Sequence, residues 1–576
     1  MTFKYSILIS LILLLSSNVG QGQQLTYDEI DSYWQTGKTL PVSVAKQYPL
    51  PLQPVVEDNG LNVMIDLAHQ CKFATMWGLP RRLNNQGFRA IGNQAALNSV
   101  LDANGKCRVR MPWDETRKIY PFAWYPNFEY NVIITTQTDL NAQNYLPEEQ
   151  EALVRFVNEG GGLIIFGTTP TAGKLVEEWS LNQLSSRFGA KFTSESDAYR
   201  DVAYATISCN NEWEVKAKGE KGNPVVASRQ LGKGKVIVVG HEELLSNTKG
   251  DELKAAEKDR LLVSLLQEAA TGKDPVGGEP RYPMANGGGG GIYPELEKQF
   301  NDIVLFYAAN QKPELIQAVN QDVPRAKELI EGWLPSKPTL EPMYLVLSSG
   351  GGGGWAVNAY KPKENGIISL SPKGIISIFA HELAHTMHGP VNDEGNVAGI
   401  TPIPNRGEAH AGWFQGKVDA WFDTGLRDYP VKKCNRLFDF DSSGDQLDLV
   451  THYENEKLRE KYGKGKDWTK TWWIWQKLDD RYGPTWYPRW KYIQHTRWKE
   501  TPMHRLTWDE MVEDMSIAVG EDLFPFMRLA GLSLQKQRLE KVEFNGKIFN
   551  LNAALIEVSE AGAVKLEKIG DYKQEL

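Results

Sequence analysis

The chain has 576 residues and a formal net charge of −8. Its length corresponds to roughly three or four domains of about 150 residues each. The mild negative charge argues against nucleic acid as a partner, which would require a basic patch.

Residues 1–22 are predicted to form a cleaved signal peptide. Lys4 supplies a positive charge, and an apolar core runs from Ile7 to Leu15. No later apolar run approaches the roughly 20 residues of a membrane-spanning helix. We therefore expect a secreted or periplasmic protein that does not span a membrane.

Residues 60–271 are predicted to form an α/β domain, after an N-terminal extension at 23–59. An amphipathic stretch at 147–158 separates two of its β-rich runs. The β-rich runs lie at residues 61–65, 132–136, 163–166 and 236–239. This alternation predicts a doubly wound, largely parallel sheet with helices on both faces.

Two segments of this region carry a resemblance: residues 148–162, which lead into a buried run, and residues 232–235, which read Gly-Lys-Gly-Lys before the last strand. Together they resemble glutamine amidotransferase-like domains. Enzymes of that type carry a nucleophile on a sharp strand-to-helix turn. The corresponding residues 167–170 contain no Cys, and no base is evident near Thr168. We expect a non-catalytic scaffold or interaction module.

The four cysteines are Cys71, Cys107, Cys209 and Cys434. Export permits disulfides, and four Cys allow three connectivities. Full pairing requires a bridge between the two halves of the chain. Otherwise one pair forms, and Cys434 and one other cysteine stay free. The sequence leaves both alternatives open.

A linker rich in Gly and Pro is predicted at 272–294. A second Gly run, at 350–354, directly precedes Trp355, Ala356 and Val357. Because Gly lets another backbone approach closely, this segment is a candidate edge strand. A flexible loop is the alternative.

His381-Glu382-Leu383-Ala384-His385 reads H-E-x-x-H and ends an apolar run. On a helix, positions i and i+4 share a face, with Cβ atoms roughly 5–6 Å apart. This spacing lets His381 and His385 hold one Zn²⁺ ion. Glu382 then points toward the open coordination position, where it acts as general base on a bound water. The alternative is a surface helix that happens to carry two His.

A third metal ligand must lie downstream, and the candidates are His388, Glu394, Glu408 and His410. Glu408 is favoured because it opens a predicted second helix, and a ligand on a helix is better positioned than one on a loop. Two His and one Glu are an established catalytic zinc set. The alternative for Glu408 is a carboxylate that interacts with the helix dipole.

Gly407-Glu408 downstream of H-E-x-x-H, with the segments 472–483, 507–512 and 520–527, resembles the enhancin-type, mucin-degrading zinc metallopeptidases (peptidase family M sixty, gluzincin group). The resemblance covers about residues 290–535. Many members have Gly where this chain has Ala384. The resemblance implies a mainly helical zinc metallopeptidase domain at 295–540, which hydrolyses polypeptides in glycoprotein or mucin-like substrates.

The same resemblance implies two further roles. An edge strand beside the zinc helix pairs with the substrate backbone in gluzincins, which assigns this role to Trp355, Ala356 and Val357. A Tyr or His from the helical half stabilises the oxyanion, and we rank His452 and Tyr453 ahead of His495. The alternative for these oxyanion candidates is an ordinary position on a helix surface or in the core.

Two patterns concern the C-terminal part. Many of the 18 Trp fall between Trp468 and Trp508, where they line a sugar-binding cleft or, as is more common, pack in the core. Residues 541–576 are predicted to form a β-hairpin-like appendage, with turns at residues 545–546 and 561–562.

A non-catalytic glycan- or protein-binding module on the same fold is the alternative function. The intact set His381, Glu382 and His385 favours the enzyme, because a pure binding protein has no need for the base Glu382.

Overall fold

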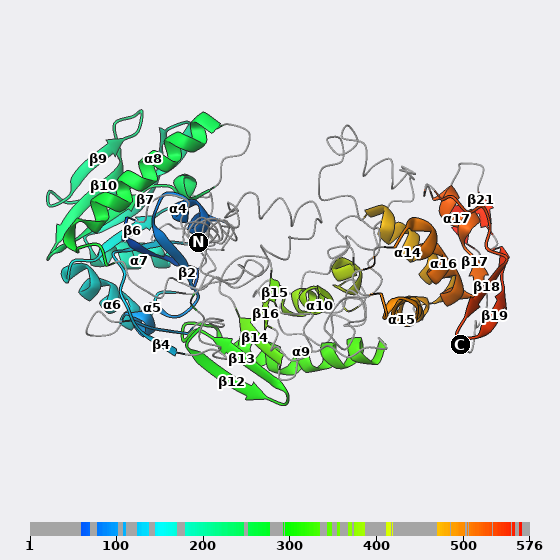
Figure 1. Cartoon of the computed structure of the whole chain (residues 1–576). Coiled ribbons are helices and arrows are strands. Elements are labelled where there is room, and N and C mark those ends of the chain that lie inside the picture. Colours follow the sequence, from blue (N-terminus) through cyan, green and yellow to red (C-terminus); the bar gives the residue numbers. More distant parts are fainter. Residues whose placement is uncertain are drawn as a thin grey trace, which may run out of the picture.

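The protein is described by a computed structural model (Figure 1). The structure describes residues 59–69, 78–101, 107–110, 124–137, 144–169, 179–246, 252–276, 292, 294–333, 343–347, 354–357, 367–370, 374–385, 410–415, 418, 469–483, 485–501, 504, 506–530, 532, 534–553, 556–558 and 564–566. The predicted signal peptide lies outside these residues and stays a prediction. Within the described residues, no helix combines the length and apolar character needed to cross a bilayer.

A seven-stranded sheet organises the first part of the chain, in the order β2-β1-β5-β6-β11-β10-β9. The strands are β1 (Asn62–Asp66), β2 (Arg89–Asn93), β5 (Val132–Thr136), β6 (Gly162–Phe166), β9 (Glu214–Lys218), β10 (Pro224–Leu231) and β11 (Gly234–Val239). The first five in spatial order are parallel, and β10 and β9 are antiparallel. The four predicted β-rich runs fall in β1, β5, β6 and β11.

Helices cover both faces of this sheet. One face carries α5 (Leu97–Val100), α6 (Pro147–Asn158) and α7 (Ser180–Arg187). The other carries α4 (Leu79–Asn84) and α8 (Glu252–Ala269). Neighbouring residues of one strand enter different cores, as Ile133 and Ile134 do, because successive side chains of a strand point to opposite faces. The mixed α/β class predicted from the sequence is present.

Smaller elements complete this part of the chain. They are β3 (Cys107–Arg110), β4 (Trp124–Phe128), β7 (Ala190–Tyr199), β8 (Val202–Cys209), η2 (Glu242–Leu245) and η3 (Ala270–Gly272). β3 pairs with β4 and β7 pairs with β8, both antiparallel. Among the described residues, the half-buried thiol of Cys209 has no disulfide partner, and burial raises its pKa. The side chains of the other three cysteines lie outside the described set, so both predicted pairing alternatives stay open.

A second, five-stranded sheet follows, in the order β12-β13-β14-β16-β15. Its strands are β12 (Leu296–Phe300), β13 (Ile303–Tyr307), β14 (Met343–Leu347), β15 (Trp355–Val357) and β16 (Ile367–Leu370). β13, β14 and β16 are parallel, whereas β12 and β15 are antiparallel edge strands. The helices α9 (Pro313–Trp333) and α10 (Ile375–His385) share the core of this sheet.

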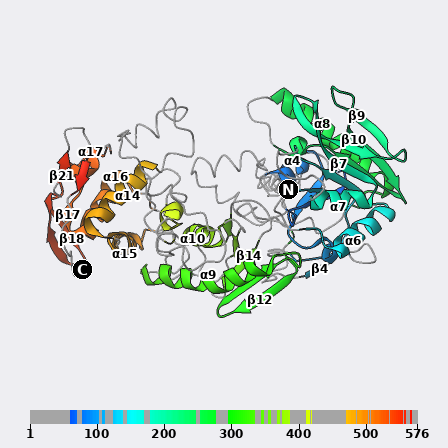
Figure 2. The same ribbon diagram turned by 180° about the vertical axis from the view of Figure 1, so that it is seen from behind.

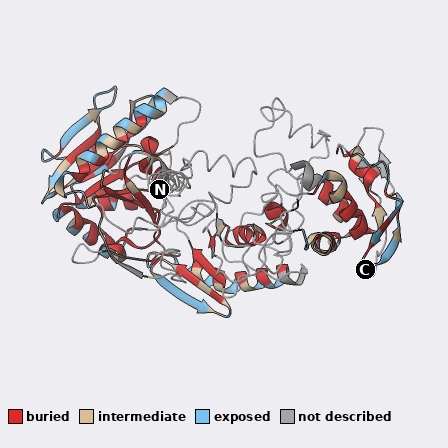
Figure 3. Ribbon diagram, viewed as in Figure 1, coloured by how far each residue is buried: buried red, intermediate tan, exposed pale blue. Residues whose placement is uncertain are grey.

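The C-terminal helices lie beyond α10, which Figures 1 and 2 show between them and the first sheet. They are α14 (Thr469–Tyr482), α15 (Trp486–Trp498), α16 (Trp508–Val519) and α17 (Phe524–Leu529). Their inner faces are buried (Figure 3). α16 begins at a capping box, in which Thr507 and Glu510 exchange hydrogen bonds, and ends at Gly520 in the left-handed conformation.

Several tryptophans of this half are core residues. Trp413, Trp475, Trp486, Tyr487 and Trp490, here called the aromatic cluster, are all buried. The centroids of Trp475 and Trp490 lie 6.0 Å apart, as do those of Trp486 and Trp490. Of the two predictions for this Trp-rich segment, the sugar-binding cleft is wrong for these residues and core packing is confirmed. A ring inside a packed core has no face left for a sugar.

Short strands end the chain. They are β17 (Glu521–Asp522), β18 (Lys541–Phe544), β19 (Lys547–Asn550), β20 (Asn552–Ala553), β21 (Ile556–Val558) and β22 (Val564–Leu566). β18 and β19 form the hairpin predicted at residues 545–546, where Asn545 and Gly546 have φ of 50° and 71°. A two-residue turn with both φ values positive matches the right-handed twist of its strands. β21 and β22 form a second antiparallel pair.

A buried polar cluster joins the two sheets. His69, just after β1, lies between two carboxylates: its Nδ1 is 2.8 Å from Asp66 and its Nε2 is 3.2 Å from Glu149. The side-chain amide of Asn310, which follows β13, lies 3.0 Å from His69 Nε2. Glu295 accepts hydrogen bonds from the backbone N–H groups of residues 96 and 309. We call these five residues the junction cluster.

Two carboxylates of the junction cluster favour the protonated form of His69. Burial alone lowers the pKa of His69, but Asp66 and Glu149 outweigh it and raise that pKa to about 10. Burial raises the pKa of Glu149, and the facing imidazolium reverses this so that its pKa is lowered. The ring of Tyr145 stacks on His69 with centroids 3.9 Å apart. His69 is therefore enclosed by Asp66, Glu149 and the ring of Tyr145.

Candidate metal centre

The helix that carries H-E-x-x-H has a buried first half, and its two His residues near the C-terminal end are partly exposed. Residues 375–380 of α10 are all buried, and the helix starts after Gly374, whose φ is 151°. His381 and His385 are half-buried, one turn apart, with ring centroids 4.9 Å apart. The predicted helical spacing is therefore present, and both imidazoles lie on the same side of α10.

Glu382 completes the group that can hold a metal. One ligand atom from each of His381, Glu382 and His385 lies within 4.8 Å of the others. Glu382 itself is 5% exposed. Two imidazoles are ligands that zinc takes, and a carboxylate at this distance reaches a water on the same ion. The donor set fits zinc.

A close backbone approach fixes Glu382 from the side of the second sheet. A Cβ placed on Gly354 would lie 2.9 Å from Glu382 Cγ, 2.5 Å from Ile378 Cγ2 and 2.4 Å from the Ser369 carbonyl oxygen. No side chain larger than that of Gly fits there without a shift of backbone. Gly354, the last residue of the second Gly run, therefore allows the chain to pass directly over α10.

The strand that follows Gly354 is an edge strand. β15 pairs antiparallel with β16 and ends the five-stranded sheet on the side of α10. The edge-strand prediction for Trp355, Ala356 and Val357 is confirmed and the flexible-loop alternative is wrong. Their predicted role in binding substrate is untested by the fold alone.

The predicted second helix is present at residues 410–415 and 418. Of the candidates for the third ligand, His388, Glu394 and Glu408 lie outside the described residues. His410 is described and is not a metal ligand, because both ring nitrogens face α15. Its Nδ1 contacts the Tyr487 hydroxyl, and its Nε2 lies 3.4 Å from Lys491 Nζ.

One residue at this centre was missed by the sequence analysis. Gln415 Oε1 lies 3.2 Å from His381 Nδ1, across 34 positions of the chain. The signal that could have revealed it is its spacing of seven from the favoured ligand Glu408, because residues i and i+7 share a helix face.

The oxyanion candidates His452 and Tyr453 lie outside the described residues, so their positions remain predictions. The lower-ranked His495 is half-buried on α15.

The first sheet also differs from expectation at Thr168. Its hydroxyl donates a hydrogen bond to Glu242 Oε1 at 3.2 Å, so the expectation that no base lies nearby is wrong. The two residues follow β6 and β11, whose carboxyl ends are neighbours in the sheet. A pairing across 74 positions leaves no local pattern in the sequence.

Comparison with known proteins gives no family for this chain. No family model matches the sequence, and no curated protein matches it. The mmIFT52 N-terminal domain is similar at 15% identity and a TM-score of 0.25, covering 36% of this chain and 97% of that one. A cytoplasmic protein from Salmonella typhimurium LT2 shows 12% identity and a TM-score of 0.24, covering 36% and 98%. An exo-beta-1,4-mannosidase from Opitutaceae bacterium strain TAV5 shows 11% and 0.22, covering 39% and 37%. Similarities this weak carry no argument about function.

Proposed function

We propose that the protein is an exported zinc-dependent endopeptidase that hydrolyses peptide bonds in glycoprotein or mucin-like substrates. The observation that carries this proposal is the joint placement of His381, Glu382 and His385 within 4.8 Å on one helix. An edge strand lies directly beside that helix. A structural helix needs neither the paired imidazoles nor the buried carboxylate between them.

His381 and His385 hold the metal, and Glu408 is the proposed third protein ligand. A bound zinc ion would polarise the scissile carbonyl and acidify a water. Glu382 takes the proton from that water and later delivers it to the leaving amine. Its low exposure suits this role, because few bulk waters compete for the carboxylate.

Trp355, Ala356 and Val357 are the proposed binding segment for the substrate. A strand at the edge of a sheet offers backbone N–H and C=O groups to an extended peptide, which adds as a further strand. Such pairing reads the backbone and leaves substrate side chains free to point away. A peptide that carries glycans on those side chains can therefore bind in the same way.

Tyr453 and His452 are the proposed donors to the oxyanion of the tetrahedral intermediate. A donor that acts mainly in the transition state lowers kcat with little change in KM when it is removed. The Tyr453→Phe and His452→Ala variants test this assignment. Parental kcat in both would discard it in favour of His495.

The first sheet and its helices are proposed as a non-catalytic scaffold or interaction module, joined by the linker at 272–294 to a gluzincin-type domain at 295–540. The hydrogen bond between Thr168 and Glu242 supplies a carboxylate but no activated nucleophile. An uncharged Thr hydroxyl is a weak nucleophile until a base removes its proton.

The proposal is tested with the full chain and its Glu382→Gln variant. Zinc content is measured after exhaustive dialysis, and cleavage of casein and of a mucin is followed in the same preparations. We expect about one zinc per chain in both proteins. We expect the variant to lose about 10²–10⁴-fold in turnover, the usual contribution of a placed general base.

Two results would contradict the proposal. Parental turnover in Glu382→Gln would show that Glu382 is not the general base, which contradicts the proposed mechanism. Bound zinc without cleavage of either substrate favours the alternative, a non-catalytic binding module. Zinc content in Glu408→Ala tests the third ligand separately, since unchanged zinc there moves that role to Glu394 or His388.

A further inference from the structure

The contact between His381 and Gln415 joins the metal helix to the segment at 410–415. Both side chains are half-buried, and the 3.2 Å separation joins His381 Nδ1 to the amide oxygen of Gln415. The Gln415 side chain offers its oxygen only as an acceptor. The ring must therefore donate, which places the imidazole proton on Nδ1.

A proton on Nδ1 leaves the lone pair on Nε2 of His381. A neutral imidazole binds a metal through its unprotonated nitrogen, and metal-binding His residues commonly donate the other N–H to a nearby acceptor. Such an acceptor fixes both the tautomer and the orientation of the ring. Without one, the ring turns about its side-chain bonds and populates the wrong tautomer part of the time.

The segment that carries Gln415 packs against the C-terminal helices α14 and α15. His410 stacks on Trp475 with centroids 5.2 Å apart, and Trp413 meets the same ring edge-on at 5.6 Å. Phe414 packs edge-on against Tyr487 at 5.7 Å. All these rings are buried, so the backbone that precedes Gln415 has little freedom.

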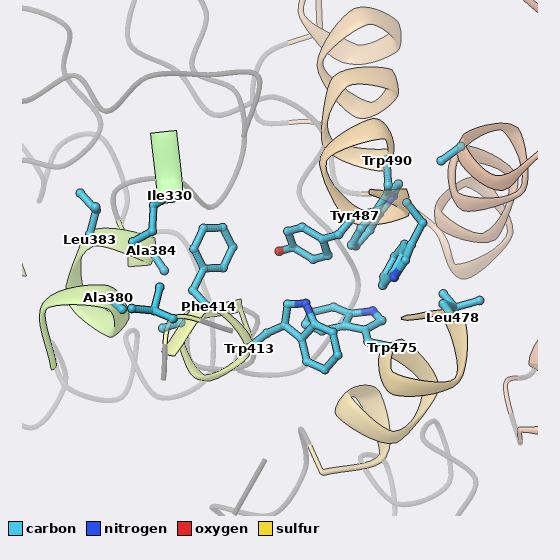
Figure 4. Close-up of a cluster of buried hydrophobic side chains, with 14 of the residues drawn as sticks. Ile330, Ala380, Leu383, Ala384, Trp413, Phe414, Trp475, Leu478, Tyr487 and Trp490 are labelled. Atoms are coloured by element: carbon cyan, nitrogen blue, oxygen red, sulfur yellow. The ribbon is translucent and has the colours of Figure 1, made fainter. Parts of the chain in front are cut away.

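Figure 4 shows how this support reaches the metal helix. Phe414 lies between Ala380 and Ala384 of α10 on one side and Tyr487 on the other. The residue directly after Phe414 is Gln415, whose amide meets the ring of His381. Packing therefore runs from the aromatic cluster through residues 410–415 to a metal ligand.

We propose that Gln415 is a positioning residue for the metal site: its amide oxygen holds His381 in the tautomer and orientation that bind zinc, and the aromatic cluster fixes Gln415 in turn. This inference rests on the proposed function. It adds a residue 34 positions after His381. Gln415 touches neither substrate nor metal and acts through His381 alone.

The test is the zinc affinity of the full chain, measured by competition with a chromophoric chelator. Gln415→Met removes the acceptor and keeps an unbranched side chain of similar length. We expect its zinc affinity to fall by about 10–100-fold, the usual cost of losing such a partner. Gln415→Glu keeps an acceptor at the same place and should bind zinc at least as tightly as the parent.

Two controls separate positioning from loss of structure. The metal-free proteins are compared by thermal unfolding, where Gln415→Met should match the parent. Gln150 is also half-buried and bonds a backbone carbonyl through its amide at 3.2 Å, but it lies in the first part of the chain. Gln150→Met should leave zinc affinity unchanged. Cobalt-substituted Gln415→Met should show altered visible absorption bands, which report ligand geometry directly.

Parental zinc affinity and an unchanged cobalt spectrum in Gln415→Met would overturn the inference and leave the proposed peptidase standing. If Gln415→Met unfolds early, the decision passes to Gln415→Glu, and weaker zinc binding there than in the parent overturns it too. A parent that binds no zinc overturns both the inference and the proposed function.

Discussion

Two of the clusters of His and carboxylate among the described residues have surroundings that favour different states. In the junction cluster, His69 is fully buried between Asp66 and Glu149, and its pKa is raised to about 10. At the candidate metal centre, His381 and His385 are half-buried, and one neighbour of His381 is the uncharged amide of Gln415. The carboxylates favour a charged imidazolium at His69, whereas the amide oxygen beside His381 adds no charge.

The difference shows what turns a histidine into a structural ion or a metal ligand. Two facing carboxylates stabilise the imidazolium, and once both ring nitrogens carry protons no lone pair is left for a metal. An amide oxygen on one nitrogen accepts a hydrogen bond without adding charge. It leaves the other nitrogen available. Composition alone does not separate the two clusters, because both contain His and Glu.

The largest effect is expected when a metal ligand is removed. His385→Ala should lower zinc affinity by more than about 100-fold, since losing only a supporting partner already costs about 10–100-fold. Zinc retained after dialysis is the measurement. His69→Gln is the matched control and should keep parental zinc. If both variants lose zinc equally, the two clusters are coupled and the comparison fails.

Removing His69 should instead reduce stability. His69→Leu leaves two carboxylates buried without their cation, and breaking a buried pair in this way costs about 3–5 kcal/mol. Urea unfolding of the first part of the chain measures the loss. Arg187→Leu, which removes an ion pair with Glu151 whose side chains are about half exposed, should cost at most about 1 kcal/mol. Equal losses in the two variants would show that the junction cluster adds no stability.

Gly354→Ala should disturb the metal centre through packing. The new methyl group would lie 2.4 Å from the Ser369 carbonyl oxygen and 2.9 Å from Glu382 Cγ. Overpacking of this kind typically costs about 1–3 kcal/mol, and we expect lower kcat with zinc retained. Gly222→Ala, between β9 and β10, is the control for backbone strain: a Cβ there meets nothing, but the φ of 87° is unfavourable for a side chain, so this variant should lose stability and keep parental kcat. A parental kcat in Gly354→Ala would show that the strand, and not Glu382, absorbs the shift.

The last effect depends on pH and concerns the charge on His69. Its folded pKa of about 10 lies above the unfolded value of 6.5, so its stabilisation is complete below pH 6.5 and is lost as the pH rises toward 10. One proton gives a slope of at most about 1.4 kcal/mol per pH unit. The difference in unfolding free energy between the parent and His69→Gln, followed from pH 6 to 10, isolates this term. A constant difference would mean that His69 is neutral when folded.

Local patterns in the sequence predict much of this structure. The runs at 132–136 and 163–166 are strands because β-branched and apolar residues favour a buried sheet. The helix at 147–158 is read from its amphipathic period and from Pro147 at its start. The i, i+4 spacing of His381 and His385 is equally local. Each of these predictions needs only neighbours within a few positions.

Local patterns do not predict contacts between residues that are far apart in the sequence. Gln415 and His381 are 34 positions apart, Thr168 and Glu242 are 74 apart, and the His69–Asn310 contact spans 241. The packing of whole helices and strands determines which of these distant residues meet. The Trp-rich segment shows the same limit, because aromatic residues on a helix suit either a cleft or a core until the facing helix is known.

The aromatic cluster also gives this protein an optical property. Indole rings with centroids 6.0 Å apart are close enough for their electronic transitions to couple, which splits a circular dichroism band into a pair of opposite sign. Among the described residues, the part of this signal that comes from Trp475 and Trp490 depends on the contact between α14 and α15. Its disappearance during heating or in denaturant would therefore time the separation of these two helices, independently of the first sheet and without any attached dye.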